Sequence, residues 1–193
     1  YLPAIRKKKR CRPDTLSKLA QELQCRSPQR TMKSPGRINR MKSVRLGNSS
    51  LEVSELCLGT MYFGAKMDES ESFRLLDRYY EAGGRFLDTA NKYATWVPGF
   101  PEPVGEGLLG RWLKSRNIRS GITIATKLGF PYGEVPRGLT ADLIISEAEK
   151  SLKRLNLDTI DLYYAHADDP ATPVEESMKA FNSLVTAGKV REI

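Results

Sequence analysis

The fold is decided by residues 121–166, which read GITIATKLGFPYGEVPRGLTADLIISEAEKSLKRLNLDTIDLYYAH. The first seven residues, 121–127, are a short run rich in β-branched side chains, which is typical of a strand. Residues 140–155 predict a helix, and residues 160–166 predict a second strand. A strand, a helix and a further strand in this order indicate a right-handed βαβ unit whose strands are parallel.

The same unit repeats on both sides of this stretch. A turn-rich hairpin is predicted at 44–53, strands at 56–60, 85–89 and 190–193, and helices at 68–82, 105–115 and 172–187. Strands that alternate with helices form parallel sheets, and a complete (β/α)₈ barrel needs about 250 residues and eight units. The chain supplies four units and the start of a fifth strand. We therefore expect an α/β fold, a TIM barrel truncated to about its first half.

Cysteine usage gives two expectations. The three cysteines are odd in number and far apart in the sequence, which argues against a disulfide framework and favours a reducing compartment, taken here as the cytoplasm. Cys57 stands in the apolar run 56–58, which lacks alternation and so suits a strand buried on both faces. We therefore expect Cys57 to be a small core residue. With a single histidine and no clustered cysteines, no metal site is predicted.

Charge is distributed unevenly along the chain. Residues 1–40 hold 12 Lys or Arg and two acidic residues, a net charge of +10, which leaves −2 on the remainder of a chain whose total is +8. The remainder has no electrostatic reason to bind nucleic acid or an anionic membrane. No apolar stretch approaches the roughly 20 residues that a membrane helix needs.

The basic segment 1–40 is poor in branched apolar residues and contains several prolines, a composition typical of disorder. Helical spacing at 15–24 allows one short helix. The Lys/Arg run at 6–12 is typical of a nuclear-import or nucleic-acid-binding arm, and an organellar transit peptide is a second interpretation. A third is that the segment is not native to the protein, because the chain begins with Tyr and regular structure starts directly after Met41.

Four polar residues follow the predicted strands. Asp88, Lys127 and His166 stand at or next to the C-terminal ends of three successive strands, and Tyr93 lies in the loop after Asp88. In a parallel barrel these ends open onto one face, where active sites form. An ammonium at Lys127 would lower the pKa of the Tyr93 phenol, and Asp88 would keep that ammonium charged. Each residue alone also has an ordinary explanation as a helix cap, a solvated lysine or a packing side chain.

Residues 41–193 resemble the N-terminal part of an aldo-keto reductase. Four segments carry the resemblance, and they occur in the family's order: Leu58-Gly59-Thr60-Met61-Tyr62-Phe63-Gly64, Phe86-Leu87-Asp88-Thr89-Ala90-Asn91-Lys92-Tyr93, Ile124-Ala125-Thr126-Lys127-Leu128-Gly129 and Ile160-Asp161-Leu162-Tyr163-Tyr164-Ala165-His166. The resemblance implies a TIM barrel and NAD(P)H-dependent reduction of aldehydes or ketones to alcohols. It also implies that the partner is a small carbonyl substrate.

Residue roles follow from the resemblance. Tyr93 is implied to be the general acid and Lys127 the group that lowers its pKa. Asp88 is implied to hold Lys127, and His166 to orient the carbonyl. Gly59, Thr60, Met61 and Asp88 are implied to border the nicotinamide of NADP(H) or NAD(H).

Two interpretations remain for the aromatic residues Tyr62, Phe63 and Trp96. They are candidates for the wall of an apolar substrate pocket, and ordinary packing at the end of the barrel explains them equally well.

The resemblance also sets a limit, because the family draws most of its cofactor contacts from strands five to eight. A sequence that ends at Ile193 is therefore expected to have little or no activity by itself. Half a barrel would leave open sheet edges and wet apolar surface. The alternative is a non-catalytic interaction module or a pseudoenzyme, with self-association of the incomplete barrel and a basic arm that binds nucleic acid.

Overall fold

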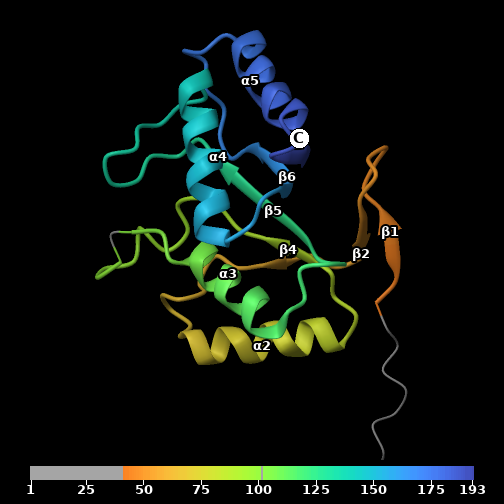
Figure 1. Cartoon of the computed structure of the whole chain (residues 1–193). Coiled ribbons are helices and arrows are strands. Elements are labelled where there is room, and N and C mark those ends of the chain that lie inside the picture. Colours follow the sequence, from red (N-terminus) through yellow and green to blue (C-terminus); the bar gives the residue numbers. More distant parts are fainter. Residues whose placement is uncertain (1–40, 101) are drawn as a thin grey trace, which may run out of the picture. The chain divides into compact units, whose positions relative to one another are not determined.

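Parallel hydrogen bonding organises the part of the chain that the computed structural model describes, residues 41–100 and 102–193 (Figure 1). One sheet has the strand order β3 (Leu58–Gly59), β4 (Phe86–Asp88), β5 (Thr123–Leu128), β6 (Ile160–Ala165) and β7 (Val190–Glu192). Every neighbouring pair in it is parallel. The predictions for residues 1–40, namely disorder, a short helix and a basic binding arm, lie outside the described residues.

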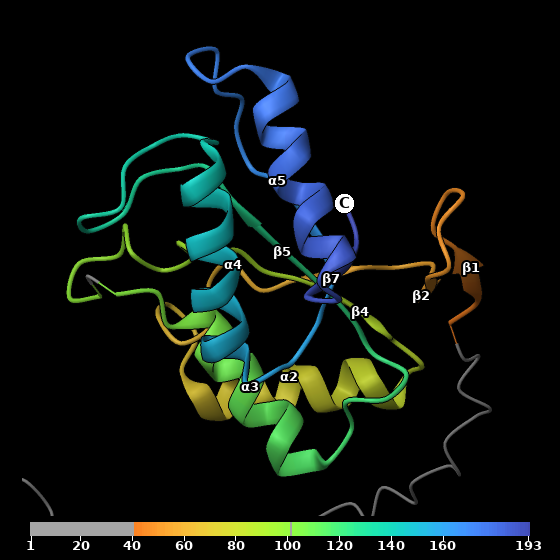
Figure 2. The same ribbon diagram turned by 45° about the horizontal axis from the view of Figure 1, so that its top comes forward.

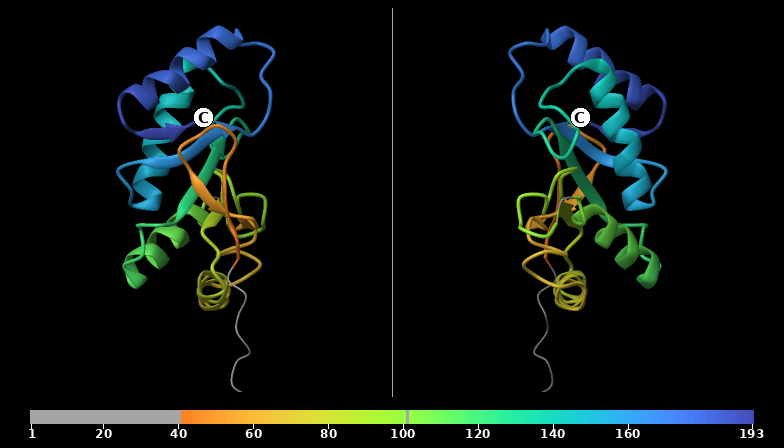
Figure 3. Two further views of the ribbon diagram at one scale, coloured as in Figure 1. Left: turned by 90° about the vertical axis from the view of Figure 1, so that its right-hand side faces the viewer. Right: turned by 90° about the vertical axis from the view of Figure 1, so that its left-hand side faces the viewer.

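A helix follows each of the first four strands of this sheet. These helices are α2 (Glu69–Glu81), α3 (Gly105–Arg116), α4 (Ala141–Leu155) and α5 (Val174–Thr186). Helices α3, α4 and α5 lie on the same side of the sheet (Figures 2 and 3). The predicted strands and helices of the sheet are confirmed, with ends that shift by no more than two residues. The alternation confirms the first part of a (β/α)₈ barrel.

Local sequence explains where these helices begin and end. The Asp68 carboxylate accepts a hydrogen bond from the Glu71 backbone N–H at 2.8 Å and so caps the start of α2. Helices α3 and α4 end at Asn117 and Asn156, whose φ angles of 53° and 55° are left-handed. Asparagine tolerates this conformation better than most residues, which is why it stops a helix cleanly. No helix in the described ranges is long and apolar enough to cross a membrane.

The predicted hairpin is also present, as antiparallel strands β1 (Ser43–Arg45) and β2 (Glu52–Ser54). The Ser54 hydroxyl accepts the Arg85 backbone N–H at 2.9 Å, directly before β4 begins. The Ser50 backbone N–H donates to the Glu192 carboxylate of β7 at 3.0 Å. Through these contacts the hairpin lies against the sheet at the end where the strands start, which leaves their C-terminal ends clear.

The core consists of two clusters of buried side chains. The α2–α3 cluster includes Leu76, Trp112 and Ile124, and the α4–α5 cluster includes Ile144, Tyr163 and Phe181. Strand β5 contributes to both, with Ile124 in the first and Leu128 in the second, and Leu157 is partly buried against both. The sheet therefore connects two packing units that share β5 as their boundary.

The prediction that the strand at 56–60 is buried on both faces is wrong. The hydrogen-bonded strand β3 is only Leu58–Gly59, the Leu56 side chain is 60% exposed, and Cys57 is an exposed free thiol. The reason is position, because β3 is the edge of the described sheet and pairs with β4 alone. Partial loss of hydration raises the pKa of the Cys57 thiol to about 11, and the negative charge of Asp88 contributes to this rise. The thiol therefore stays protonated near neutral pH and is a poor nucleophile.

Close packing of α3 on α4 depends on the absence of a side chain at Gly110. A Cβ atom at this position would lie 2.6 Å from the Leu155 carbonyl oxygen and 2.8 Å from that of Arg154. Both atoms belong to backbone, which cannot move aside without separating the helices. At Gly107, on the same helix, a Cβ atom would meet only the Arg111 guanidinium, at 3.4 Å.

We expect Gly110→Ala to lower the free energy of unfolding by about 1–3 kcal/mol, the usual cost of overpacking. Gly107→Ala should instead raise it by up to about 1 kcal/mol, because alanine favours the helix over glycine. Urea unfolding followed by circular dichroism measures both changes. Shifts of the same sign in the two variants would contradict the close contact between α3 and α4.

Candidate active site

The structure brings the predicted site residues to one end of the sheet. Asp88 is the last residue of β4, Lys127 is next to last in β5, and His166 directly follows β6. The His166 backbone N–H donates to the Leu128 carbonyl at 2.6 Å, which extends the pairing of β5 and β6 past the end of β6. Because these strands are parallel, their C-terminal ends share one edge. Three side chains far apart in sequence therefore face the same region.

A buried ion pair forms the centre of this region. The Lys127 ammonium donates to Oδ2 of Asp88 at 2.6 Å and to the Thr89 carbonyl at 2.6 Å. The Lys127 side chain is only 5% exposed, so its charge is compensated inside the protein and not by solvent. Charge-assisted hydrogen bonds of this kind are roughly twice as strong as neutral ones.

The second oxygen of the Asp88 carboxylate is also engaged. Oδ1 accepts a hydrogen bond from the Tyr164 hydroxyl at 2.5 Å. Burial, and then the hydrogen bond to Asp88, raise the pKa of Tyr164 well above its ordinary value, so the hydroxyl remains a donor. Tyr164 was missed in the sequence, although strand alternation could have found it. It stands two residues before His166, and such residues share a face of a strand.

Tyr93 lies against the Lys127 ammonium, whose Nζ is 4.8 Å from the ring centroid. The ring is 8% exposed and meets the His166 imidazole edge-on, with centroids 5.8 Å apart. The next residue, Ala94, has a φ of 83°, a conformation that residues other than glycine seldom adopt. The backbone thus turns sharply after Tyr93, which is the kind of strain that gathers at functional sites.

His166 is held as a neutral imidazole near pH 7. Burial, and then the Lys127 charge, lower its pKa from 6.5 to about 4. Its Nδ1 atom is buried and has no hydrogen-bond partner within the described ranges. The ring also packs edge-on against Phe130 at 4.8 Å between centroids. A neutral imidazole in this position can donate one N–H to a ligand oxygen without bringing a charge.

Two buried carboxylates fix the surroundings of the site. Glu147 of α4 accepts hydrogen bonds from Asn91 Nδ2 at 2.8 Å and from the Tyr132 hydroxyl at 2.7 Å. Burial acts to raise the pKa of Glu147, but these bonds and one from Lys150 outweigh it and lower the pKa. Because Asn91 is two residues from Tyr93, this contact ties the Tyr93 loop to α4.

The second carboxylate, Glu106 of α3, accepts from the Thr126 hydroxyl and from Arg154 Nε, both at 2.6 Å. Neither Glu147 nor Glu106 stands out in the sequence, because a glutamate within an amphipathic helix is usually solvated.

The residues expected to border a nicotinamide differ in accessibility. Gly59 is exposed, and a Cβ atom built on it would meet nothing within 4 Å, so there is room for a planar ring above it. Met61 is 39% exposed and also free to contact a ligand. The Thr60 hydroxyl is buried and donates to the Asp88 carbonyl at 2.9 Å. Gly59 and Met61 are thus accessible to a nicotinamide. The hydrogen bond between Thr60 and Asp88 holds together the two strand ends beside them.

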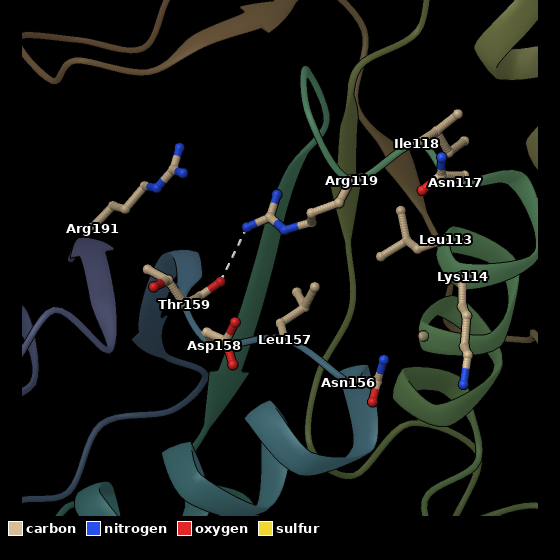
Figure 4. Close-up of a pocket in the computed structure, with 11 residues that line it drawn as sticks. Leu113, Lys114, Asn117, Ile118, Arg119, Asn156, Leu157, Asp158, Thr159 and Arg191 are labelled. Carbon is tan, nitrogen blue, oxygen red and sulfur yellow. Dashed lines mark hydrogen bonds between the residues drawn. The ribbon is translucent and has the colours of Figure 1, made fainter.

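A cleft of about 360 Å³ lies at the opposite end of the strands (Figure 4). Arg119 donates there to the Thr159 carbonyl at 3.1 Å, and both Arg119 and Arg191 form ion pairs with the buried Asp161. The two arginines of the cleft therefore share one carboxylate as their ion-pair partner. No group of three or more possible metal ligands occurs in residues 41–100 and 102–193.

The strand order and the helices that follow each strand define the first part of a (β/α)₈ barrel with a polar site at its C-terminal edge. The aldo/keto reductase family model matches residues 55–193. The chain therefore belongs to the aldo/keto reductase family of oxidoreductases. A solved structure of an aldo-keto reductase from Bacillus halodurans, in its holo form, matches with a TM-score of 0.68 and 34% identity and covers 79% of this chain and 49% of that one.

Two curated relatives agree with this assignment. The uncharacterized oxidoreductase YrpG of Bacillus subtilis is 39% identical over 157 residues, which cover 78% of this chain and 47% of that protein. The norsolorinic acid reductase stcV of Emericella nidulans is 39% identical over 163 residues, which cover 75% of this chain and 40% of that protein. The chain thus spans a little under half the length of these relatives.

The pKa of His166 gives a prediction for stability. The unfolded chain protonates this imidazole near pH 6.5, whereas the folded chain does so only near pH 4. The free energy of unfolding should therefore decrease as the pH falls from 6.5 to 4. Above pH 6.5 it should not depend on this group. His166 is the only histidine of the chain, so its ring-proton NMR signals report it directly.

We expect these signals to titrate with a midpoint near pH 4. Lys127→Met should raise the midpoint because it removes a nearby positive charge. The matched control Lys114→Met, an exposed position on α3 that lines the cleft of Figure 4, should leave it unchanged. A midpoint near 6.5 in the unmodified chain would show that His166 is hydrated and not enclosed.

Proposed function

We propose that the protein reduces aldehydes or ketones to alcohols with NADPH or NADH as the hydride donor. The observation that carries the proposal is the buried Asp88–Lys127 ion pair, set against the Tyr93 ring and beside the neutral imidazole of His166. Membership in an oxidoreductase family supports it. So does the name of one relative, a norsolorinic acid reductase.

Each residue has one task in this proposal. The Lys127 ammonium, 4.8 Å from the Tyr93 ring centroid, places a positive charge beside the phenol as it gives up its proton. Tyr93 donates its proton to the carbonyl oxygen as negative charge develops there. His166, as a neutral donor, fixes the same oxygen by a hydrogen bond. Asp88 holds Lys127 in position through their ion pair, and Tyr164 keeps Asp88 oriented.

A nicotinamide bound here would supply the hydride for the carbonyl carbon, and Tyr93 would supply the proton for the oxygen. Gly59 and Met61 would contact the nicotinamide, and Thr60 and Asp88 would hold the strand ends on which it rests. The odd number of scattered cysteines supports the cytoplasm as the compartment.

We expect Tyr93→Phe to lower kcat/KM for benzaldehyde with NADPH by about 10²–10⁴, the usual contribution of a positioned general acid. The change should appear in kcat, because the ring and its packing are kept. Tyr80→Phe is the matched control, since this tyrosine lies on α2, packed edge-on against Trp112. Unchanged turnover in Tyr93→Phe would disprove its role, and no NADPH oxidation with any aldehyde would disprove the activity for this chain.

A second candidate is a non-catalytic module that associates with itself. It is favoured by an apolar depression of about 260 Å³ beside β7, lined by Tyr163, Tyr164, Ala165, Met178, Phe181 and Ile193. Met178 is 48% exposed and Ile193 46%. In the described sheet, β7 is an edge strand that pairs only with β6. Such edges are templates for pairing with another chain.

This candidate predicts a dimer in light scattering coupled to size exclusion. Met178→Glu should shift the dimer toward monomer, because it places a charge in the apolar depression. Glu175→Gln on the same helix, outside the residues that line the depression, is the control and should not shift it. A monomer at all concentrations would rule out this association.

A further inference from the structure

The Lys92 side chain has an unusual position next to Tyr93. Its ammonium lies 4.8 Å from the Phe130 ring centroid and 5.9 Å from that of Trp96. The side chain is half-buried, and burial lowers its pKa. No carboxylate in the described ranges lies within ion-pair distance of it. A partly desolvated cation that contacts aromatic faces alone retains much of its capacity to bind an anion.

The other cations near the site differ from Lys92 in this respect. Lys127 is paired with Asp88 at 2.6 Å. Arg137 also lies over the Phe130 ring, at 5.5 Å, but it pairs with Asp168 at 3.3 Å. Of the two cations that lie over the Phe130 ring, Lys92 is therefore the one without an ion-pair partner among the residues that the structure describes.

Lys92 also borders the place where a carbonyl oxygen would sit. Tyr93 meets Trp96 edge-on at 5.9 Å and His166 edge-on at 5.8 Å, and His166 meets Phe130 at 4.8 Å. The two rings that flank Lys92 are thus the neighbours of the two groups that would hold the oxygen. Trp96 is 44% exposed, so its face is open to a ligand. Aromatic walls of this kind suit a planar ring.

We propose that Lys92 is a specificity residue that selects aromatic carbonyl compounds bearing a carboxylate. The aromatic ring of the substrate would pack on Trp96 and Phe130, with its carbonyl at Tyr93 and His166 and its carboxylate at the Lys92 ammonium. The inference rests on the proposed reductase activity for its catalytic outcome, but the binding that it describes does not require turnover.

Charge elsewhere on the described part supports a local origin for this selection. Residues 41–193 carry a net charge of −2, so their overall field does not attract an anion. A preference for a carboxylate would have to come from a nearby unpaired cation, and Lys92 is placed to supply it. A charge-assisted hydrogen bond to a carboxylate is also stronger than the one that the uncharged carbonyl of a methyl ester can accept.

The test compares para-formylbenzoate with its methyl ester, which has a similar shape and no charge. In the unmodified chain with NADPH, we expect a higher kcat/KM for the carboxylate. Lys92→Met should reduce the ratio of the two values about tenfold, the change expected from losing one charge-assisted hydrogen bond. The loss should lie in KM, with kcat for the ester unchanged. Lys92→Arg should keep the preference, and Lys114→Met, at the far end of the strands, should leave it intact.

Ligand-observed NMR titration of the same two compounds gives a second readout that is independent of turnover. Binding of the carboxylate should weaken about tenfold in Lys92→Met, and binding of the ester should not change. An equal preference with and without Lys92, in either readout, would overturn the inference. If neither compound is reduced but the carboxylate still binds through Lys92, the reductase proposal fails and the assignment of Lys92 stands.

Discussion

The structure of the candidate site depends on burying one lysine. An ammonium removed from water loses several kcal/mol of solvation, so it must be compensated where it lies. Lys127 receives that compensation from Asp88 and from the Thr89 carbonyl, and Asp88 in turn is held by Tyr164. Three neighbouring strands are joined at one edge as a result. Loss of either partner would leave an uncompensated charge, at a cost of about 3–5 kcal/mol.

The same principle operates in the layer of helices. Glu106 and Glu147 are fully buried carboxylates that face the sheet from α3 and α4, and each is satisfied by several donors. The contact between Glu147 and Asn91 reaches the loop of Tyr93, so helix packing and the position of the phenol are coupled. Charges thus specify how the elements meet, while Trp112 and Tyr163 with their neighbours supply the apolar burial that stabilises them.

Much of this arrangement could be predicted from sequence because its signals are local. The strand at 121–127 and the helix at 140–155 follow from residue type and spacing alone, and the parallel topology then brings Asp88, Lys127 and His166 to one edge. Burial is harder to predict, because it depends on what covers a segment. The apolar run at 56–58 looks like core, yet it lies at a sheet edge and is exposed. Glu147 was missed because its role arises from contacts with Asn91 and Tyr132, which lie outside its own helix.

The division of the core at β5 has a consequence for how the protein opens. Helix α5 packs only in the α4–α5 cluster, whereas α4 also contributes Leu155 to the α2–α3 cluster, so α5 with β6 and β7 is the unit that can loosen separately in hydrogen exchange. The site spans this boundary, with Asp88 on one side and Tyr164 and His166 on the other. A partial opening of the second unit would therefore dismantle the site long before the chain as a whole unfolds. On heating, the contact between Asp88 and Tyr164 would then be lost before the secondary structure, and a ligand that contacts both sides would hold the two units together.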